Sequence, residues 1–231
     1  MQYIRVNVGK MAYQRTEQIN ALRSNIQFSG KDRKVFLVTS CLQGEGKSTT
    51  SLQLSKSLAD LGKNVLYIDA DLRASVVVGK IEGEKPTFGL SHLLSGQSTV
   101  KDTVCKTNIE GLYMIVAGPV PPNPTELLSA LEFGSLLQAL KSIYDYIIID
   151  SAPLGMVVDA AILAEKCDAA ILVIESKAIK RKLAQKVKGR LESVGIPILG
   201  AVLTKADKKD MGKYYGKEYG ENYYSKPKKS K

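Results

Sequence analysis

The chain has 231 residues, of which 44% are hydrophobic and 6% aromatic, a composition that supplies the core of one α/β domain and argues against two full domains. The formal net charge is +10 at pH 7, but residues 205–231 hold nine Lys against two Asp and two Glu and contribute five of those charges. The rest of the chain is only mildly basic, so the total charge alone does not indicate a nucleic-acid-binding or lipid-binding protein.

The cysteines and the hydropathy of the chain bear on its compartment. Cys41, Cys105 and Cys167 are widely spaced and match no metal-ligand pattern, which argues against a disulfide framework and favours a reducing environment. Residues 1–18 have no apolar core of signal-peptide length, and no stretch reaches the roughly 20 apolar residues of a membrane span. We therefore expect a cytoplasmic protein that meets a membrane only through a partner or through its basic end.

Short apolar runs rich in β-branched residues alternate with longer segments of helical periodicity. This alternation predicts βαβ units and a doubly wound, mainly parallel sheet, in which ligands bind beyond the carboxyl ends of the strands. We expect strands at 35–40, 64–69, 112–118, 144–150, 169–175 and 198–204. We expect helices at 12–28, 47–61, 89–95, 125–141, 157–166 and 177–193.

The two ends of the chain differ from this core pattern. The first helix carries Ile19, Leu22 and Ile26 at helical spacing, which indicates either docking against the sheet or a subunit contact. Residues after Thr204 include no Val, Ile, Leu or Phe, so they cannot build a core of their own and we expect them to be mobile. We therefore divide the chain into a domain at 1–204 and a tail at 205–231.

The segment SCLQGEGKSTTS at 40–51 lies between an expected strand and an expected helix, the setting of a phosphate-binding loop. Backbone N–H groups and the helix N-terminus there form an anion cradle, with Lys47 reaching the terminal phosphates and the Ser48 hydroxyl ligating Mg²⁺. Cys41 departs from the general pattern, which has Gly at that position, and a fortuitous Gly-rich turn is the alternative. The expected nucleotide contacts are Gly44, Glu45, Gly46, Lys47, Ser48 and Thr49.

Acidic residues end two of the expected strands. Asp150 follows the apolar run YDYIII and is placed to hold Mg²⁺ through water, while Asp69 and Asp71 in NVLYIDADLR offer a metal support and a general base. The alternatives are a turn residue for Asp150 and, for the other pair, a solvated turn with Arg73 as ion-pair partner. Asp159 is interpreted as a helix N-terminal residue or as a group behind the site.

The motifs GEGKST, IDADLR and IDSAP, in this order, resemble the bacterial tyrosine kinase family, whose relatives are the division-site and plasmid-partition ATPases of the deviant phosphate-loop class. The segment GPVPPNPTELLSA at 118–130 resembles a stretch of the same family. The resemblance implies ATP and Mg²⁺ as cofactors, with Lys47 and Ser48 at the phosphates, Ser48, Asp71 and Asp150 supporting the metal, and Asp69 or Asp71 acting as the base. Thr204 stands where the family commonly has an adenine-binding Asn.

The tail gathers five of the eleven tyrosines in a Lys- and Gly-rich setting without apolar neighbours, which resembles the phosphoacceptor cluster of the family. The expected acceptors are Tyr214, Tyr215, Tyr219, Tyr223 and Tyr224. The segment at 17–23 resembles the family's oligomer-forming motif, with Glu17 and Arg23 retained and Asn20 at the middle basic position. The alternative for the tail is a basic aromatic segment that binds RNA or lipid.

The resemblance predicts a protein-tyrosine kinase that phosphorylates its own tail between subunits and regulates capsular or extracellular polysaccharide synthesis. It also implies a homo-oligomer, of which a ring is one form, and a membrane-embedded activator that recruits the cytoplasmic chain to the inner face of the membrane. Two other functions are open at this point: an ATP-driven positioning switch without kinase activity, and a nucleic-acid-binding module. The clustered tyrosines favour the kinase over both, and no nucleic-acid partner is expected.

Overall fold

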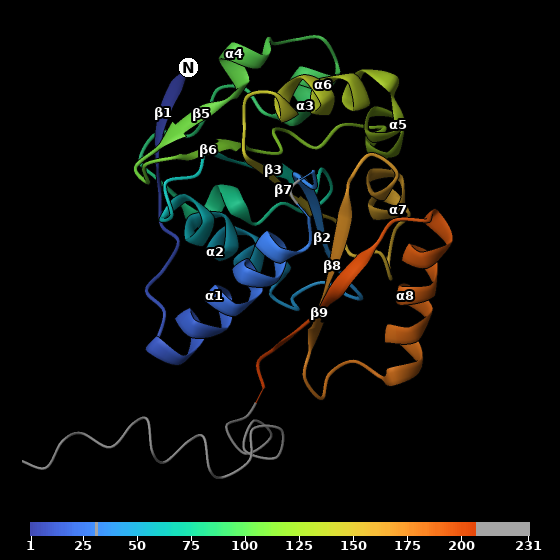
Figure 1. Cartoon of the computed structure of the whole chain (residues 1–231). Coiled ribbons are helices and arrows are strands. Elements are labelled where there is room, and N and C mark those ends of the chain that lie inside the picture. The colour runs from blue at the N-terminus through green and yellow to red at the C-terminus, as the bar shows by residue number, and fades with distance from the viewer. Residues whose placement is uncertain (31, 207–231) are drawn as a thin grey trace, which may run out of the picture.

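A computed structural model describes residues 1–30 and 32–206, in which nine strands form one sheet (Figure 1). In spatial order they are β4 (Ile81–Glu82), β1 (Gln2–Val6), β5 (Cys105–Thr107), β6 (Leu112–Ile115), β3 (Val65–Ala70), β7 (Tyr146–Ser151), β2 (Val35–Ser40), β8 (Ala169–Glu175) and β9 (Ile198–Thr204). The six strands from β6 to β9 are parallel, and the antiparallel pairs are β5 with β6 and β1 with β4. The predicted mainly parallel, doubly wound α/β architecture is confirmed.

Alternate residues of the central strands enter two separate hydrophobic cores. In β2, Phe36 and Val38 belong to one core, whereas Val35 and Leu37 belong to the other. Side chains alternate across a strand with a period of two, so these fully buried strands serve both faces of the sheet. Helices therefore have to cover both faces, which explains why the apolar runs are continuous in sequence.

The helices divide between these two cores. On one face lie α1 (Tyr13–Phe28) and α2 (Lys47–Ala59). The other core contains residues of α3 (Leu90–Leu94), α5 (Pro124–Ser129), α6 (Leu131–Lys141), α7 (Asp159–Ala164) and α8 (Arg181–Val194). Two further short elements are η1 (Val77–Lys80) and α4 (Val100–Thr103). Within residues 1–30 and 32–206, no helix has the length and apolar character needed to cross a membrane.

The strands predicted at 35–40, 169–175 and 198–204 have the observed bounds, but the single helix predicted at 125–141 is wrong. Ala130 is extended, with ψ of 145°, and separates α5 from α6. Leu128 and Phe133 are both buried, yet five residues of one straight helix would turn them about 140° apart. The break at Ala130 lets both side chains face the same core.

The segments β1, β4 and β5 were not predicted as strands. Each has five residues or fewer, and they lie together beyond β6, where pairing with a neighbour rather than a strong local pattern defines them. The first helix packs on α2, with Ile19 and Leu22 half-buried, and Ile26 is buried in the hydrophobic core that covers one face of the sheet.

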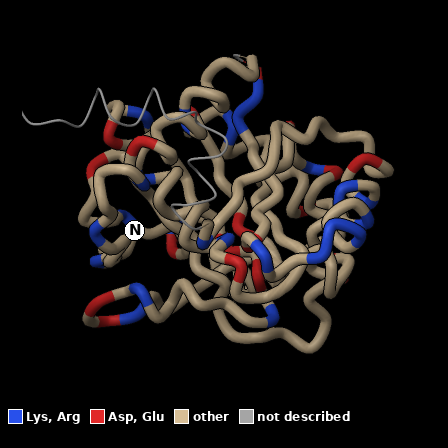
Figure 2. The backbone as a smooth tube through the Cα atoms, turned by 90° about the horizontal axis from the view of Figure 1, so that it is seen from below, with Lys and Arg blue, Asp and Glu red and all other residues tan. Residues whose placement is uncertain are grey.

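Positive charge in the described part is dense along one helix. Residues 177–190 carry seven Lys or Arg and no Asp or Glu. Figure 2 shows these basic residues along α8, at the side of the domain opposite α1. The tail is therefore not the chain's sole basic segment, although the sequence argument placed the excess charge there.

A close backbone contact joins the phosphate-binding loop to the turn after β7. A Cβ atom added at Gly155 would lie 2.0 Å from the carbonyl oxygen of Cys41. Real Cβ atoms do not approach backbone this closely, so any other residue at position 155 would push the two loops apart. The turn after β7 thus holds the start of the phosphate-binding loop in place.

Gly155→Ala should therefore destabilise the domain by about 1–3 kcal/mol, lowering Tm by about 2–4 °C for each kcal/mol, and should weaken ATP binding. Thermal unfolding and an ATP titration measure the two effects. The matched control is Gly134→Ala in α6, where an added Cβ meets nothing within 4 Å. That change should stabilise the protein by about 0.5–1 kcal/mol. Equal Tm values for the two variants would contradict the loop contact.

Candidate active site

The loop between β2 and α2 forms a backbone cradle at the carboxyl edge of the sheet. Gly44 and Gly46 have φ of +83° and +88°, a left-handed conformation that glycine adopts without strain, and Gly46 caps α2. Glu45 is buried, and its carboxylate accepts the backbone N–H of Leu42 and, at 2.9 Å, that of Glu175. The Glu45 side chain therefore braces the loop from behind, so its backbone N–H is the group left for phosphate.

Lys47 projects from the first turn of α2 into a group of buried carboxylates. Its Nζ atom lies 3.0 Å from Asp71 Oδ2, 3.7 Å from Asp150 Oδ1 and 3.3 Å from the Ser48 hydroxyl oxygen. Lys47 is 8% exposed, Asp71 is 4% exposed, and Asp69 and Asp150 are fully buried. Buried charges require a partner, so this lysine and these acids depend on one another.

The sheet brings the acids together. Asp69 of β3 pairs directly with Asp150 of β7 in the parallel register, which puts two carboxylates at the ends of neighbouring strands. Tyr67 lies two residues before Asp69, on the same side of β3, and its hydroxyl donates to Asp150 Oδ2 at 2.9 Å. The other oxygen of Asp150, Oδ1, is buried and has no hydrogen-bond partner among the described residues.

Burial and mutual repulsion shift the pKa values of these groups. Burial, together with the charge of Asp150, raises the pKa of Asp69 to about 7. Burial also raises the pKa of Asp150, although Lys47 partly offsets the effect. Burial alone would lower the pKa of Lys47, but the negative charges of Asp150 and Asp71 outweigh it and the pKa is raised. Lys47 thus stays protonated, while Asp69 is poised to take up or release a proton near neutral pH.

A second ion pair ties together three segments around the acids. Arg73 Nε lies 2.6 Å from Asp159 Oδ2, and Arg73 Nη2 donates to Asp159 Oδ1 at 3.1 Å and to the Thr125 hydroxyl at 2.8 Å. Thr125 also donates to Asp159 Oδ1 at 2.8 Å. Because Asp159 is fully buried and its fork with Arg73 is bidentate, the loop after β3 is fixed to α5 and α7.

The structure decides between several of the sequence-based alternatives. Asp69 and Asp71 are buried rather than in a solvated turn, and Arg73 pairs with Asp159 instead. Asp159 is the first residue of α7 and stands behind the site, as interpreted from the sequence. Thr204 donates its hydroxyl to the carbonyl oxygen of Glu45 at 2.7 Å, which ties β9 to the phosphate-binding loop.

The remaining predicted residues lie apart from this cluster. Thr49 is exposed on the first turn of α2. Glu17 is exposed on α1 and accepts a hydrogen bond from Asn20, while Arg23 donates to the Ser57 carbonyl and hydroxyl oxygens at 3.2 Å and 2.9 Å. The predicted phosphoacceptors lie outside the described residues; they are Tyr214, Tyr215, Tyr219, Tyr223 and Tyr224.

Sequence reasoning missed three residues that hold the acids in place. Tyr67 binds Asp150, Ser75 donates to Asp69 Oδ2 at 2.5 Å, and Thr125 joins the Arg73 pair. The period-two spacing of Tyr67 and Asp69 was a usable signal, since it places both on one side of a strand. Nothing local in the sequence marks Ser75 or Thr125, which reach the site through tertiary contacts.

The site suits Mg²⁺ that is held mainly by phosphate and water. Among residues 1–30 and 32–206, no group of three or more His, Cys, Asp or Glu side chains is arranged to bind a metal by itself. Mg²⁺ usually takes one or two protein carboxylates beside substrate phosphates. Asp150 Oδ1, which accepts no hydrogen bond within the described residues, and the nearby Ser48 hydroxyl are oxygen ligands that Mg²⁺ accepts, so the residues present fit the ion.

A strand, a glycine cradle, a lysine and strand-end carboxylates in this order define an ATP-binding enzyme of the phosphate-binding-loop class. The protein-family model described as AAA domain matches residues 33–188. The chain is 44% identical to the tyrosine-protein kinase CpsD of Streptococcus agalactiae over 222 residues, or 96% of this chain and 95% of the relative. The chain belongs to the bacterial tyrosine kinase family and is a protein-tyrosine kinase.

Solved structures agree with this assignment. The kinase domain of the Escherichia coli tyrosine kinase ETK superposes with a TM-score of 0.79 at 30% identity, covering 84% of this chain and 76% of that one. The Pyrococcus furiosus cell division ATPase MinD superposes with a TM-score of 0.63 at 27% identity, covering 75% of this chain and 74% of that one. The expected relationship to division-site ATPases is thus confirmed at the level of the fold.

The raised pKa of Asp69 makes a prediction about stability. Because about 7 exceeds the ordinary value of 3.8, the folded protein keeps a proton that the unfolded chain releases between these values, and the free energy of unfolding falls as pH rises. Asn mimics the protonated acid, so Asp69→Asn should stabilise the nucleotide-free protein more at pH 8 than at pH 5. Each kcal/mol gained should raise Tm by about 2–4 °C.

The control for this thermal-unfolding series is Asp60→Asn, which removes an exposed carboxylate paired with Lys56. That variant should show no comparable gain at pH 8. A Tm for Asp69→Asn that stays below the wild-type value at both pH values would mean that Asp69 is charged in the folded protein and is stabilised there.

Proposed function

We propose that this kinase transfers the γ-phosphoryl group of ATP to tyrosines at 214–224 of a neighbouring copy, and so regulates capsular or extracellular polysaccharide synthesis. The observation that carries the proposal is the buried cluster in which Lys47 meets Asp71 and Asp150 beside a glycine cradle. Lys47 supplies positive charge to the transferring phosphate, and the cradle supplies backbone N–H groups. Phosphoryl transfer depends mainly on such positioning and charge.

In the proposed step the phenol oxygen of an acceptor tyrosine bonds to the γ-phosphorus, the bond to the β,γ-bridging oxygen breaks, and ADP leaves. The phenol proton passes to a carboxylate. We assign the base to Asp69, because Asp71 Oδ2 binds the charged Lys47 Nζ, whereas the carboxylate of Asp69 accepts hydrogen bonds only from neutral groups, the Ser75 hydroxyl and the Asp71 N–H. The pKa of Asp69, about 7, also suits a group that has to accept a proton near neutral pH.

Mg²⁺ bound with ATP would neutralise charge on the phosphate oxygens. Ser48 and Asp150 would hold it, with Asp71 in support once ATP draws Lys47 toward the phosphates. The nucleotide contacts are those predicted from the sequence, with one refinement: Glu45 offers its backbone, since its carboxylate is engaged with Leu42 and Glu175.

The proposed assembly is a homo-oligomer that acts at the inner face of the membrane through a membrane-embedded activator. Glu17 is exposed on α1, where it can face a neighbouring copy. Arg23 instead donates from Nη1 to two oxygen atoms of Ser57 in the same chain. We therefore assign the subunit contact chiefly to Glu17. The similarity to the tyrosine-protein kinase CpsD, to the putative tyrosine-protein kinase CapB and to a putative tyrosine-protein kinase in the cps region of Klebsiella pneumoniae supports the link to polysaccharide synthesis.

Intact-mass spectrometry of the protein with Mg-ATP, with and without an activator's cytosolic peptide, tests this function. We expect phosphate-sized increments that disappear in Lys47→Met, in Asp150→Ala and in a chain ending at Thr204. The matched control is Lys101→Met, which removes an exposed lysine from α4 and should leave the increments unchanged.

A variant with Phe at all five tail tyrosines separates the acceptor from the active site. It should hydrolyse ATP normally and show no increments. Hydrolysis of ATP by the unaltered protein without increments under any condition would contradict the proposed function and favour a positioning switch. Binding that weakens steeply with salt on added nucleic acid would favour the binding-module alternative.

A further inference from the structure

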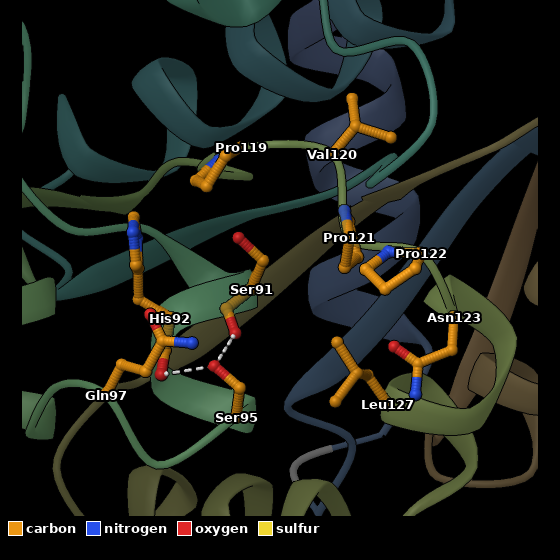
Figure 3. A pocket seen from close by; sticks show the side chains of 10 residues that line it. All are labelled: Ser91, His92, Ser95, Gln97, Pro119, Val120, Pro121, Pro122, Asn123 and Leu127. Carbon is orange, nitrogen blue, oxygen red and sulfur yellow. Dashed lines mark hydrogen bonds between the residues drawn. The ribbon is translucent and has the colours of Figure 1, made fainter.

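A cavity of about 410 Å³ lies between α3 and the segment that leads from β6 into α5 (Figure 3). One wall is apolar and includes Pro121, Pro122 and Leu127, and the facing wall carries His92 and Gln97. Cavities of this size hold small ligands or single side chains. Sequence analysis treated this Pro-rich segment only as a mark of the family, with no chemical role.

Polar groups on the α3 side of the cavity have unused hydrogen-bonding capacity. His92 Nδ1 accepts the Gly89 N–H at 3.2 Å, so the neutral ring carries its hydrogen on Nε2, which has no acceptor among the described residues. The Ser91 hydroxyl is buried without a partner, and the Gln97 amide makes no side-chain bond within the described part of the chain. Ser91 is the buried member of this set, and an unpaired buried polar group calls for an explanation, which a hydrogen-bonding ligand supplies.

The cavity is tied to the catalytic acids. Ile68 of β3 pairs with Ile115 of β6, so the chain that leaves β6 runs beside the strand end that carries Asp69. Leu90 N–H donates to the carbonyl oxygen of Val116 at 2.7 Å and holds α3 against this segment. On the other side, the Arg73 to Thr125 bond fixes α5, whose residues wall the cavity, to the loop after Asp71. The cavity and the active site therefore share one edge of the sheet and one set of supports.

The lining chemistry restricts the ligand. Among the described residues that line the cavity there is no Lys, Arg, Asp or Glu, so neither a phosphate nor a metal ion finds a counter-charge. Proline faces and a leucine suit the flat ring of an aromatic side chain, and the Nε2 and amide groups suit its hydroxyl. An unmodified tyrosine meets both requirements. Phosphotyrosine, with about −1.5 to −2 charges, does not.

We propose that this cavity docks one unphosphorylated tyrosine from residues 214–224 of a second copy while another tyrosine of the same segment reaches Asp69. The inference rests on the transfer between copies proposed above. Tyrosines in that segment recur at intervals of four or five residues, as Tyr214 and Tyr215, then Tyr219, then Tyr223 and Tyr224. In an extended chain that interval spans about 13–17 Å, so the proposal requires the cavity and Asp69 to lie within about that distance of each other.

The length and position of the segment support this occupant. Twenty-five residues, 207–231, follow the described part, and they contain five tyrosines. Thr204 ends β9 at the carboxyl edge of the sheet, where its hydroxyl binds Glu45. The tyrosine segment of each copy therefore follows a strand that ends at the same edge of the sheet as the acids. Because the cavity accepts only an unmodified ring, each tyrosine would leave it once it is phosphorylated.

A mixing experiment with full-length chains tests the proposal. Gln97→Trp fills the rim of the cavity at an exposed position. Gln185→Trp makes the same change at an exposed position of α8 and serves as the control. Each is used as the enzyme on a Lys47→Met acceptor that cannot phosphorylate itself. Gln97→Trp should transfer about tenfold more slowly or worse at low acceptor concentration, with a raised KM for the acceptor, and should hydrolyse ATP normally. The control should match the unaltered enzyme.

The same substitution is then placed in the acceptor. A Lys47→Met, Gln97→Trp chain should accept phosphate from the unaltered enzyme at the normal rate, because the cavity acts in the enzyme copy. Normal transfer by Gln97→Trp, or equal losses in both roles, would overturn the docking proposal while leaving the proposed function intact. Failure of the unaltered enzyme to phosphorylate the Lys47→Met acceptor would instead overturn the proposed function, and the docking proposal with it.

A second set of acceptors tests the ligand itself. Both acceptors are Lys47→Met chains in which Tyr219 is the sole tail tyrosine. With Phe at the four other positions, the acceptor keeps aromatic rings for the cavity to hold and should have a low KM. Ala at those positions should raise the KM for the acceptor without changing the maximal rate. Equal KM values for the Phe and Ala acceptors would overturn the assignment of an aromatic side chain to the cavity.

Discussion

The active site depends on the ion pairs between one buried lysine, Lys47, and the buried carboxylates around it. Parallel pairing of β3 with β7 forces Asp69 and Asp150 side by side, and Asp71 follows within two residues. Like charges at this spacing in a buried site are costly unless a cation or a proton offsets them. Lys47 supplies the cation, and Asp69, with its pKa raised to about 7, is a carboxyl group that can hold a proton near neutral pH. The strain of this arrangement is what a nucleotide with its metal ion can relieve.

The surrounding loops keep this costly arrangement intact. Glu45 braces the phosphate-binding loop, Thr204 ties that loop to β9, and Arg73 joins the loop after β3 to α5 and α7. The hydrogen bonds made by the Glu45 carboxylate and the Arg73 guanidinium are charge-assisted and therefore stronger than bonds between neutral groups. They also extend the active site along the sheet edge, so that the cavity beside α5 is built on the same frame as the acids.

Most of the fold and most of the residues expected to react could be predicted from the sequence, because both follow from local sequence patterns. Buried strands read as apolar runs, the glycine motif has its context between strand and helix, and strand-end acids share an edge once the sheet is parallel. The short strand β1 and the break at Ala130 were not predicted, since tertiary pairing and packing define them. Ser75 and Thr125, which hydrogen-bond to Asp69 and Asp159, were not predicted for the same reason. Tertiary packing brings their segments to the acids, and no local sequence pattern indicates that contact.

Urea unfolding of a double-mutant cycle, without nucleotide at pH 8, tests the dependence of the carboxylates on Lys47 most directly. Lys47→Met should cost about 3–5 kcal/mol, because it leaves buried charges unpaired. In an Asp150→Asn background the same change should cost at least about 1 kcal/mol less, since one of those charges is already gone. Equal costs in the two backgrounds would contradict the account, because they would show that Lys47 and Asp150 do not stabilise each other in the folded protein.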